Sequence, residues 1–506
     1  MSKILVIRPP YAYADYSFGV IPLGFYSTFL TRYPPLVLMY LAELLRRAGH
    51  RVVLMDGEAE ELENPSIIKR VGPFKPDLIL GNVNIYNPIR NFKDLIELKA
   101  NFGARLIVRG HFPALFPAQS MARPLVDVAM TGKGFTNIVE LAAALEHQTD
   151  LRRIPGIAFR DNGELINTGP EEMIKDMDQL PFPARDLVDN RFYATNLTYR
   201  LPMTTMFGSL GCPYRCAYCQ DSVLPYRRRS ANGVYLEMLE CAQKHGIREI
   251  AFLDPTFTIG REWTLELSQK LIDGNSDLTF TMRTRPDLLD FEMLHSLKRA
   301  GCVRISLGIE SGDPEILQGL SRDIDLQHIQ RAVEMIRDAG IMVFGYFMLG
   351  NKNESHRSLQ NTMKLVRKLP LHFAQFLQVI PLPHTSISED YQKKFGRDLW
   401  MEINEGRFPT ADEFRAQDTN LSLSELRTWS TKFYLAFYLS PRRWWDIARL
   451  KYTPGYLRRQ FEISFLLLRQ FLLRSIRRNH PAYRLDSFQH AINGGQAGQT
   501  IEAGSR

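Results

Sequence analysis

The first 150 residues alternate short apolar runs with stretches in which apolar residues recur at helical spacing. Residues 36–48 form the clearest helical stretch, which ends at Gly49, a residue type that commonly terminates helices. Strands that alternate with helices predict a parallel sheet with helices on both faces, and such sheets bind ligands at the carboxyl ends of their strands. The predicted strands are residues 3–7, 51–55, 77–80, 105–108 and 126–130.

Residues 201–395 repeat strand and helix at even spacing. Six such units predict a partial (β/α)6 TIM barrel, with its reactive face at the carboxyl ends of the strands. The predicted strands are residues 204–209, 249–253, 279–283, 304–308, 343–349 and 376–380. Residues 151–200 are rich in prolines and turn residues, so we expect a linker with one hairpin over 156–167. A mainly helical region, 396–493, and a disordered Gly-rich tail, 494–506, complete the predicted α/β chain.

Composition and charge fit an ordinary folded protein with one unusual region. Of the 506 residues, 45% are hydrophobic and 23% are charged, and no apolar run reaches the roughly 18 residues of a membrane span. The first apolar run stops at Pro9 and Pro10, so we interpret it as a strand and expect a cytoplasmic protein. The net charge of +8 concentrates in residues 426–484, where 13 basic residues oppose Asp446 and Glu462.

Three of the five cysteines form a C-x3-C-x2-C cluster, Cys212, Cys216 and Cys219. Cys241 and Cys302 stand alone beside apolar neighbours, which is typical of buried cysteines. An odd, clustered set in a large cytosolic chain indicates metal binding. Thiolates select zinc, copper(I) or iron–sulfur clusters, and no fourth Cys or His lies within ten residues to close a zinc site. On a [4Fe–4S] cluster, three thiolates leave one iron open to a second molecule.

This cluster, with the aromatic Tyr218 directly before its last cysteine, resembles the signature of the radical S-adenosyl-L-methionine (SAM) superfamily. The resemblance continues through four segments that follow later strands, 252–257, 284–287, 308–312 and 345–350. It implies that the three cysteines hold the [4Fe–4S] cluster and that an electron from it cleaves SAM to methionine and a 5′-deoxyadenosyl radical. The implied SAM contacts are Tyr218, Asp254, Arg285, Glu310, Ser311 and Arg322.

Some of these contacts also have a simpler interpretation. Glu310 lies between Ile309 and two turn-forming residues, a setting that favours a ligand over a surface carboxylate. Arg285 and Arg322 fit solvated arginines equally well. Residues 351–354 have the sequence Asn-Lys-Asn-Glu where the superfamily has Pro-Gly-Glu-Thr, and we expect this difference to alter a loop and not the chemistry. No side chain is singled out as catalytic.

The first domain, residues 1–150, resembles the Rossmann-like cobalamin-binding domain that many radical SAM proteins carry. The resemblance implies cofactor contacts from Gly110, His111 and Gly132. The chain lacks the D-x-H-x-x-G motif that would supply a histidine to cobalt, which leaves either cobalamin with its base displaced or a vestigial domain that binds nothing. A nicotinamide site is disfavoured because the glycine run beginning at Gly132 follows the last predicted strand of this domain and not the first. The segments that carry the resemblance are 34–36, 56–57, 110–113, 154–157 and 180–186.

The basic C-terminal region mixes arginines with aromatic residues. In residues 461–478, apolar residues fall on one helical face, while Arg474, Arg477 and Arg478 fall on another. Such a segment could pack on the barrel with a solvated basic face, lie on an anionic membrane through residues 426–484, or bind nucleic acid. Nucleic acid is the least favoured of the three. We therefore expect the protein in the cytoplasm, where this region could also place it at the inner face of the membrane.

The nearest group is the cobalamin-dependent radical SAM family that includes methyltransferases of unactivated carbon and the anaerobic cyclase of bacteriochlorophyll synthesis. This resemblance implies an enzyme that methylates a hydrophobic small molecule, using SAM, the cluster and cobalamin, with electrons from a reductant such as flavodoxin or ferredoxin. A radical oxidase or cyclase acting on a porphyrin or a polycyclic lipid would use the same cofactors. The alternative outside catalysis is a cluster-bearing, membrane-associated binding protein.

Overall fold

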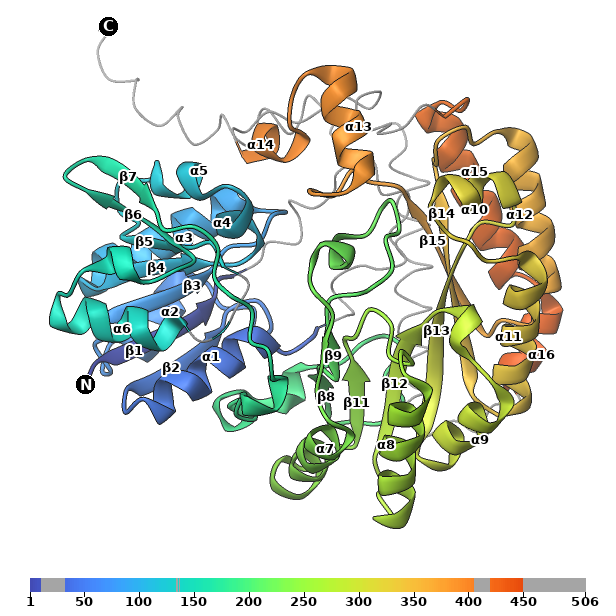
Figure 1. Ribbon diagram of the computed structural model, residues 1–506, viewed down its shortest axis with the longest axis horizontal. Coiled ribbons are helices and arrows are strands. Elements are labelled where there is room, and N and C mark those ends of the chain that lie inside the picture. The colour runs from blue at the N-terminus through green and yellow to red at the C-terminus, as the bar shows by residue number, and fades with distance from the viewer. Residues whose placement is uncertain (11–31, 133–134, 136, 405–418, 449–506) are drawn as a thin grey trace, which may run out of the picture.

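The first domain is built on a seven-stranded sheet with the order β2-β1-β3-β4-β5-β6-β7 (Figure 1). The computed structural model describes residues 1–10, 32–132, 135, 137–404 and 419–448. The first five strands are parallel, as the sequence predicts, and the last two run antiparallel. The strands are β1 (Lys3–Arg8), β2 (Arg51–Asp56), β3 (Leu78–Asn82), β4 (Arg105–Arg109), β5 (Val128–Met130), β6 (Ile157–Asp161) and β7 (Glu164–Asn167).

Helices cover both faces of this sheet. One face packs against α1 (Leu36–Arg47) and α6 (Asn137–His147), and the other packs against the remaining helices of the domain. The hairpin expected inside the linker completes the sheet, because Ile157 and Phe159 of β6 bury their side chains with the α1 face. The helices of the second face are α2 (Asn64–Val71), α3 (Pro88–Phe102), α4 (His111–Leu115) and α5 (Pro117–Met121).

The second domain is the predicted partial barrel of six parallel strands in the order β15-β14-β13-β12-β11-β8. Its strands are β8 (Met203–Met206), β11 (Glu249–Phe252), β12 (Thr279–Thr284), β13 (Cys302–Glu310), β14 (Met342–Leu349) and β15 (Phe373–Gln378). Its helices lie on the outside of the curved sheet (Figure 1). They are α7 (Ala231–His245), α8 (Arg261–Asp273), α9 (Phe291–Arg299), α10 (Pro314–Gly319), α11 (Leu326–Asp338) and α12 (His356–Lys368).

The part of the C-terminal region that the structure describes is helical, as predicted, and one of its helices protects the open edge of the barrel. Tyr438 Oη lies 3.3 Å from Ala374 N and 2.8 Å from Ala374 O, and Tyr434 Oη accepts a hydrogen bond from Phe376 N. These hydroxyls satisfy backbone groups that an edge strand leaves unpaired. The helices are α13 (Ser386–Phe395), α14 (Leu399–Asn404), α15 (Leu423–Tyr438) and α16 (Pro441–Ala448), and the amphipathic segment predicted over 461–478 lies outside the described residues.

The segment between the two sheets is fastened to the barrel by a buried arginine. Arg185 has 1% of its surface exposed, and it forms an ion pair of 2.6 Å with Glu237 of α7. It also donates to the backbone carbonyl of Thr205 at 3.0 Å. Arg229 binds the other oxygen of the same carboxylate, so two buried cations share one buried anion.

The carboxyl ends of both sheets meet. Val83 and Phe112, which follow β3 and β4, belong to one hydrophobic cluster with Tyr218 and Val379 of the second domain. On the other face of the first sheet, Phe207 and Leu253, which follow β8 and β11, pack against a cluster that contains α1 and α6. The edges where parallel sheets bind ligands therefore face each other across the domain boundary. In the part of the chain that the structure describes, no helix is long and apolar enough to span a membrane.

Candidate active site

The three clustered cysteines lie on one loop at the carboxyl end of β8. A two-stranded antiparallel ladder, β9 (Ser209–Leu210) with β10 (Arg227–Arg228), closes the base of this loop. Gly211 opens it at φ +69°, and a β-carbon there would lie only 2.5 Å from the backbone oxygen of Leu224. Only glycine meets both demands, so the sequence fixes this turn directly before the first cysteine.

The loop is held to the rest of the barrel by backbone contacts. Ala217 N donates to the carbonyl of Leu320 at 3.1 Å, and Ser386 Oγ donates to the carbonyl of Ala217 at 3.1 Å. Gln220 Nε2 donates to Pro383 O at 3.1 Å. The cysteine loop is thus fixed from two sides, by the segment after α10 and by the start of α13.

All three cysteines are free thiols, with Cys212 buried and Cys216 and Cys219 half-buried. Burial raises the pKa of Cys219 to about 12, and the carboxylate of Asp221 adds to this increase. A [4Fe–4S] cluster takes one thiolate on each of its irons, so its ligands need not converge on one point. Among the described residues, no three His, Cys, Asp or Glu side chains converge as they would around a single metal ion. The donor set fits three irons of a cluster.

Three of the predicted SAM contacts come together beside the cysteine loop. Tyr218 Oη donates to Glu310 Oε1 at 2.7 Å, and Arg322 donates to the carbonyl of Gly308 and lies 3.8 Å from Cys216 Sγ. Glu310 follows a register shift at the end of β13 and takes a φ of +63°, a strained conformation for a residue with a side chain. Strain of this kind concentrates at functional sites.

Burial acts on the pKa values of Glu310 and Arg322. Burial raises the pKa of Glu310, although Arg322 and the Tyr218 hydrogen bond oppose the increase. Burial acts to lower the pKa of Arg322, but Tyr218, Glu310 and Cys216 outweigh it and keep the guanidinium charged. Nε of Arg322 is buried without a hydrogen bond in the described structure. The site therefore presents a carboxylate, a phenol and a guanidinium next to the cysteine loop.

The other three predicted SAM contacts are engaged with the protein itself. Arg285 stacks on the ring of Tyr214 at 3.9 Å and pairs with Asp287 at 3.0 Å, so it holds the cysteine loop in place. Asp254 accepts hydrogen bonds from Gly208 N and Ser209 Oγ, and burial raises its pKa to about 6 against these two bonds. Ser311 is fully buried, and its hydroxyl lies 3.1 Å from Thr362 Oγ1.

The loop after β14 contains a buried carboxylate, Glu354, that the sequence does not mark as buried. Glu354 is fully buried, and its oxygens accept hydrogen bonds from Gly350 N, Asn351 N and Asn351 Nδ2. Burial raises its pKa to about 7. The side chain thus shapes the loop at the carboxyl end of the fifth barrel strand in sequence, which agrees with the expectation that the difference at 351–354 concerns a loop.

At the carboxyl edge of the first sheet, Gly110 and Gly132 lie where an added β-carbon would collide with neighbouring atoms. Gly110 has φ +122°, and a β-carbon there would lie 2.4 Å from the backbone oxygen of Val83. A β-carbon on Gly132 would lie 2.3 Å from Glu171 Oε2. His111 is exposed and begins α4. Arg109, directly before Gly110, has a buried Nε without a hydrogen-bond partner, a feature that the sequence does not reveal.

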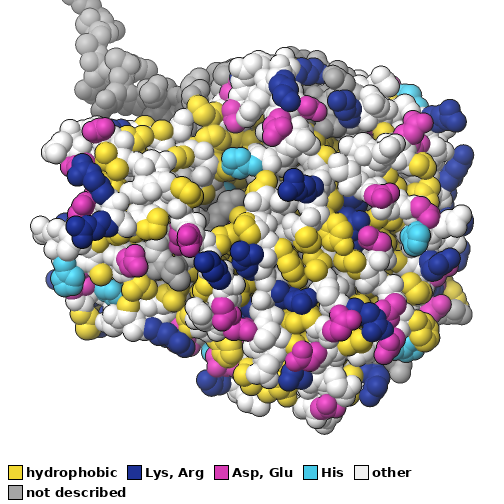
Figure 2. All heavy atoms as spheres, in the orientation of Figure 1, with side chains coloured by type: hydrophobic (Ala, Val, Ile, Leu, Met, Phe, Trp, Pro, Cys, Tyr) yellow, Lys and Arg dark blue, Asp and Glu magenta, His cyan; other side chains and the backbone are white. Residues whose placement is uncertain are grey.

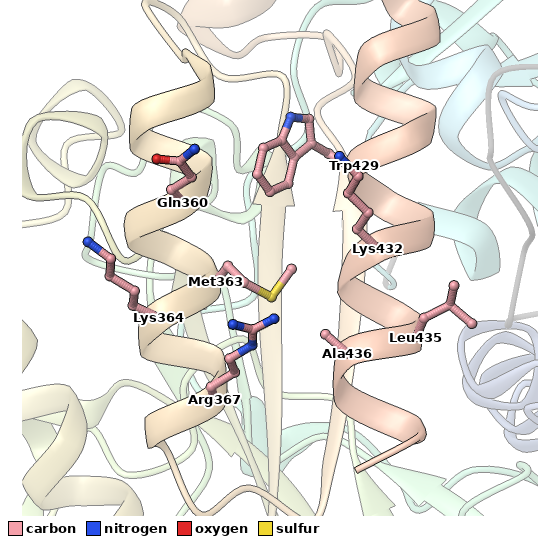
Figure 3. A pocket seen from close by; sticks show the side chains of 8 residues that line it. All are labelled: Gln360, Met363, Lys364, Arg367, Trp429, Lys432, Leu435 and Ala436. Carbon is pink, nitrogen blue, oxygen red and sulfur yellow. The ribbon is translucent and has the colours of Figure 1, made fainter.

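The visible face of the molecule is mixed in character. Figure 2 shows hydrophobic side chains across this face, including its middle, interspersed with Lys and Arg and with Asp and Glu side chains. A separate groove of about 480 Å³ lies on the outside of the barrel between α12 and α15, away from the cysteine loop. Met363 and Arg367 from α12 and Trp429 from α15 point into this groove (Figure 3).

Two family models match the two domains. The model of the radical SAM superfamily matches residues 206–366, and that of the B12 binding domain matches residues 24–142. A radical SAM domain uses a [4Fe–4S] cluster and SAM, and a B12-binding domain uses cobalamin. The first match spans the cysteine loop and Glu310, and the second spans the facing edge of the first sheet.

Individual relatives and a solved structure are similar to most of this chain. The chain is 28% identical to an uncharacterized methyltransferase of Pyrococcus horikoshii over 81% of this chain and 88% of the relative. It is 23% identical to the anaerobic magnesium-protoporphyrin IX monomethyl ester cyclase of Rubrivivax gelatinosus, over 72% of this chain and 67% of the cyclase. The solved structure of the radical SAM methyltransferase TsrM from Kitasatospora setae has the same fold, with a TM-score of 0.64, 18% identity, and coverage of 78% and 77% of the two chains.

Proposed function

Given that the chain belongs to the radical SAM proteins that carry a B12-binding domain, we propose that it transfers a methyl group from SAM to a carbon atom of a hydrophobic small molecule. The observation that carries the proposal is the meeting of the two carboxyl edges. Val83 and Phe112 of the first sheet share a hydrophobic cluster with Tyr218 of the cysteine loop. A cofactor on the first sheet and SAM on the barrel would therefore share one water-poor space.

Cofactor positions follow from the residues at each edge. Cys212, Cys216 and Cys219 would hold the cluster, and Tyr218, Glu310 and Arg322 would contact SAM. Gly110 and Gly132, which follow β4 and β5, would lie beside cobalamin at the carboxyl edge of the first sheet. When bound, the cluster supplies the electron that cleaves SAM and cobalamin supplies a carrier for the methyl group.

The chain's own side chains position and shield these groups. Glu310 offers a carboxylate to the cationic amino group of SAM, and Tyr218 orients that carboxylate through its 2.7 Å hydrogen bond. Arg285 fixes Tyr214 within the cysteine loop, and thereby the spacing of the thiols on either side of it. The hydrophobic residues at the boundary would exclude water and limit side reactions of a reactive intermediate.

The substrate would enter where the two edges meet. Apolar side chains of both domains pack together there, which favours a hydrophobic molecule over a sugar or a nucleotide. The similarity to a cyclase whose name specifies a magnesium-protoporphyrin supports the same class of substrate. Electrons would come from a small reductant such as flavodoxin or ferredoxin.

Analysis of SAM products tests the proposal without a known substrate. The reconstituted protein is incubated with SAM, cobalamin and a reductant. We expect both S-adenosylhomocysteine, which remains when SAM donates its methyl group, and 5′-deoxyadenosine, which marks reductive cleavage. The Cys219→Ser variant should still bind cobalamin but form no deoxyadenosine. Deoxyadenosine without S-adenosylhomocysteine would refute methyl transfer and favour the radical oxidase or cyclase.

The outer surface of α15 and α16 supports a second proposal, contact with an anionic membrane. Leu435 of α15, Leu439 directly after α15 and Trp445 of α16 are 45%, 67% and 61% exposed, and Lys432 and Arg442 lie on the same two helices. Apolar side chains flanked by cations are typical of helices at a bilayer surface. The groove in Figure 3 continues this surface with Lys364 and Arg367, so the charge matches an anionic headgroup layer (Figure 3).

Point variants test this contact without removing α15, because α15 protects β15. We expect Leu439→Glu together with Trp445→Glu to abolish cosedimentation with vesicles that contain anionic lipid. The matched control is Leu236→Glu, a substitution of a leucine that is 47% exposed on α7. Unchanged cosedimentation of the double variant would show that this surface is not the membrane contact.

A further inference from the structure

Arg109 ends β4 at the carboxyl edge of the first sheet. In β4 the side chains alternate between the two faces, so Arg109 shares a face with Ile107, which packs with α1 and α6. The register places Asn82 of β3 directly beside it. Phe207 and Leu253 of the barrel also pack against this cluster, so Arg109 lies on the side of the edge that faces the second domain.

The guanidinium of Arg109 has no partner among the described residues. Its Nε is buried without a hydrogen bond, and the described structure gives its side chain no ion pair. Burial lowers the pKa of Arg109 to about 10, and Glu171 opposes this decrease without approaching closely enough to pair. Arg109 is half-buried and has no counter-ion among the described residues, so its guanidinium remains available to an anionic ligand.

A second arginine at this edge, Arg8, has the partners that Arg109 lacks. Arg8 ends β1, and it binds both carboxylate oxygens of Asp56, with Nε 2.7 Å from Oδ1. Tyr193 donates to the same carboxylate at 2.9 Å. The protein thus supplies a full set of partners to the arginine of β1 and none to the arginine of β4.

We propose that Arg109 binds the phosphodiester of the nucleotide tail of cobalamin. This inference rests on the proposed use of cobalamin by the first domain. The phosphodiester is an anionic oxygen acceptor that lies outside the corrin ring, and guanidinium binds phosphate oxygens through paired hydrogen bonds. The chain turns at Gly110 directly after Arg109, so Arg109 lies at the carboxyl edge of the sheet, where parallel sheets bind ligands. Arg109 is a positioning residue for the cofactor and takes no part in bond cleavage.

Cobinamide, which lacks the nucleotide tail and its phosphate, separates the tail from the corrin ring. Dissociation constants for cobalamin and cobinamide are measured by absorbance titration of the full-length protein. For Arg109→Gln we expect cobalamin to bind about ten- to a hundredfold more weakly, the usual effect of losing a charged hydrogen bond, and cobinamide to bind as in the wild type. Arg109→Lys should retain part of the affinity for cobalamin.

Arg105 provides the matched control. It lies on the same strand and the same face, at the amino end of β4, and its guanidinium donates to Leu145 O at 3.1 Å. Arg105→Gln should leave both constants unchanged. The thermal midpoint of the cofactor-free protein is a second readout, because removing a half-buried cation that has no partner should not lower it, whereas loss of a structural arginine would.

The possible outcomes are distinct. Equal weakening of cobalamin and cobinamide in Arg109→Gln would overturn the assignment to the phosphodiester, and unchanged binding of both would overturn any contact with the cofactor. A lower thermal midpoint of the cofactor-free variant with unchanged cobalamin binding would make Arg109 structural. Failure of the wild type to bind cobalamin would refute the proposed function itself, and this inference with it.

Discussion

Removing the hydroxyl of Tyr218 perturbs the predicted SAM contact through a single hydrogen bond. In Tyr218→Phe, Glu310 Oε1 loses the donor that lies 2.7 Å away, while the aromatic ring that packs at the domain boundary stays in place. Glu310 is only 5% exposed, so water cannot fully replace the lost donor. A buried charged group that loses a hydrogen bond costs about 1.5–3 kcal/mol.

The lost hydrogen bond also changes the protonation of Glu310. Burial raises the pKa of Glu310, and the bond from Tyr218 opposes that increase. In Tyr218→Phe the pKa of Glu310 therefore rises further, and the carboxyl group is protonated over a wider range of pH. Because the ionised carboxylate is the form that attracts the amino group of SAM, affinity for SAM should fall as pH falls, and this decline should begin at a higher pH in the variant.

Calorimetric titration of SAM into the reconstituted protein at several pH values measures both effects. We expect SAM to bind to Tyr218→Phe about tenfold more weakly at neutral pH, which corresponds to about 1.4 kcal/mol. Tyr214→Phe is the matched control, because it removes a hydroxyl from the same loop while keeping the ring on which Arg285 stacks. The role given to this bond would be refuted if Tyr218→Phe protein that carries its full complement of iron bound SAM with wild-type affinity at every pH.

Three further predictions concern the frame around the site. Gly211→Ala should reduce the iron bound after reconstitution, because the new β-carbon would collide with Leu224 O. Gly319→Ala is the control, because a β-carbon there meets open space. Equal amounts of bound iron in the two variants would contradict this prediction. Glu237→Ala should lower the free energy of unfolding by about 3–5 kcal/mol in urea, because it strands two buried arginines, and a loss below about 1 kcal/mol would argue against the shared ion pair. His372 is buried with Nδ1 accepting from Val343 N, and burial lowers its pKa to about 4. Because the unfolded chain then binds the proton more tightly, stability should fall by about 3 kcal/mol as pH falls from about 6.5 to 4, and His372→Asn should flatten this slope; parallel pH profiles would exclude it.

Strands could be predicted because local patterns determine them. The apolar runs at 3–7 and 51–55 become β1 and β2 with one residue added to each, and the six barrel strands appear in the predicted order. Glycine before the first cysteine and the C-x3-C-x2-C spacing could likewise be recognised locally. These features depend on residues close together in the chain.

Other parts of the site depend on partners that lie far apart in the sequence. The pairing of Arg185 with Glu237 spans 52 positions, and that of Tyr218 with Glu310 spans 92. Arg285 fits a solvated arginine as well as a ligand until the fold places it over Tyr214. Arg109 is distinguished only by what it lacks, a partner, which no pattern of neighbouring residues can reveal.

The proposed methyl transfer requires both domains to bind their cofactors in the same molecule. Iron and cobalt are therefore measured in the full-length protein after anaerobic reconstitution with iron, sulfide and hydroxocobalamin, and the optical spectrum is recorded. We expect about four irons and one cobalt per chain. About four irons without cobalt would contradict the proposed methyl transfer, because the first domain would then be a scaffold that presents an empty edge to the radical site.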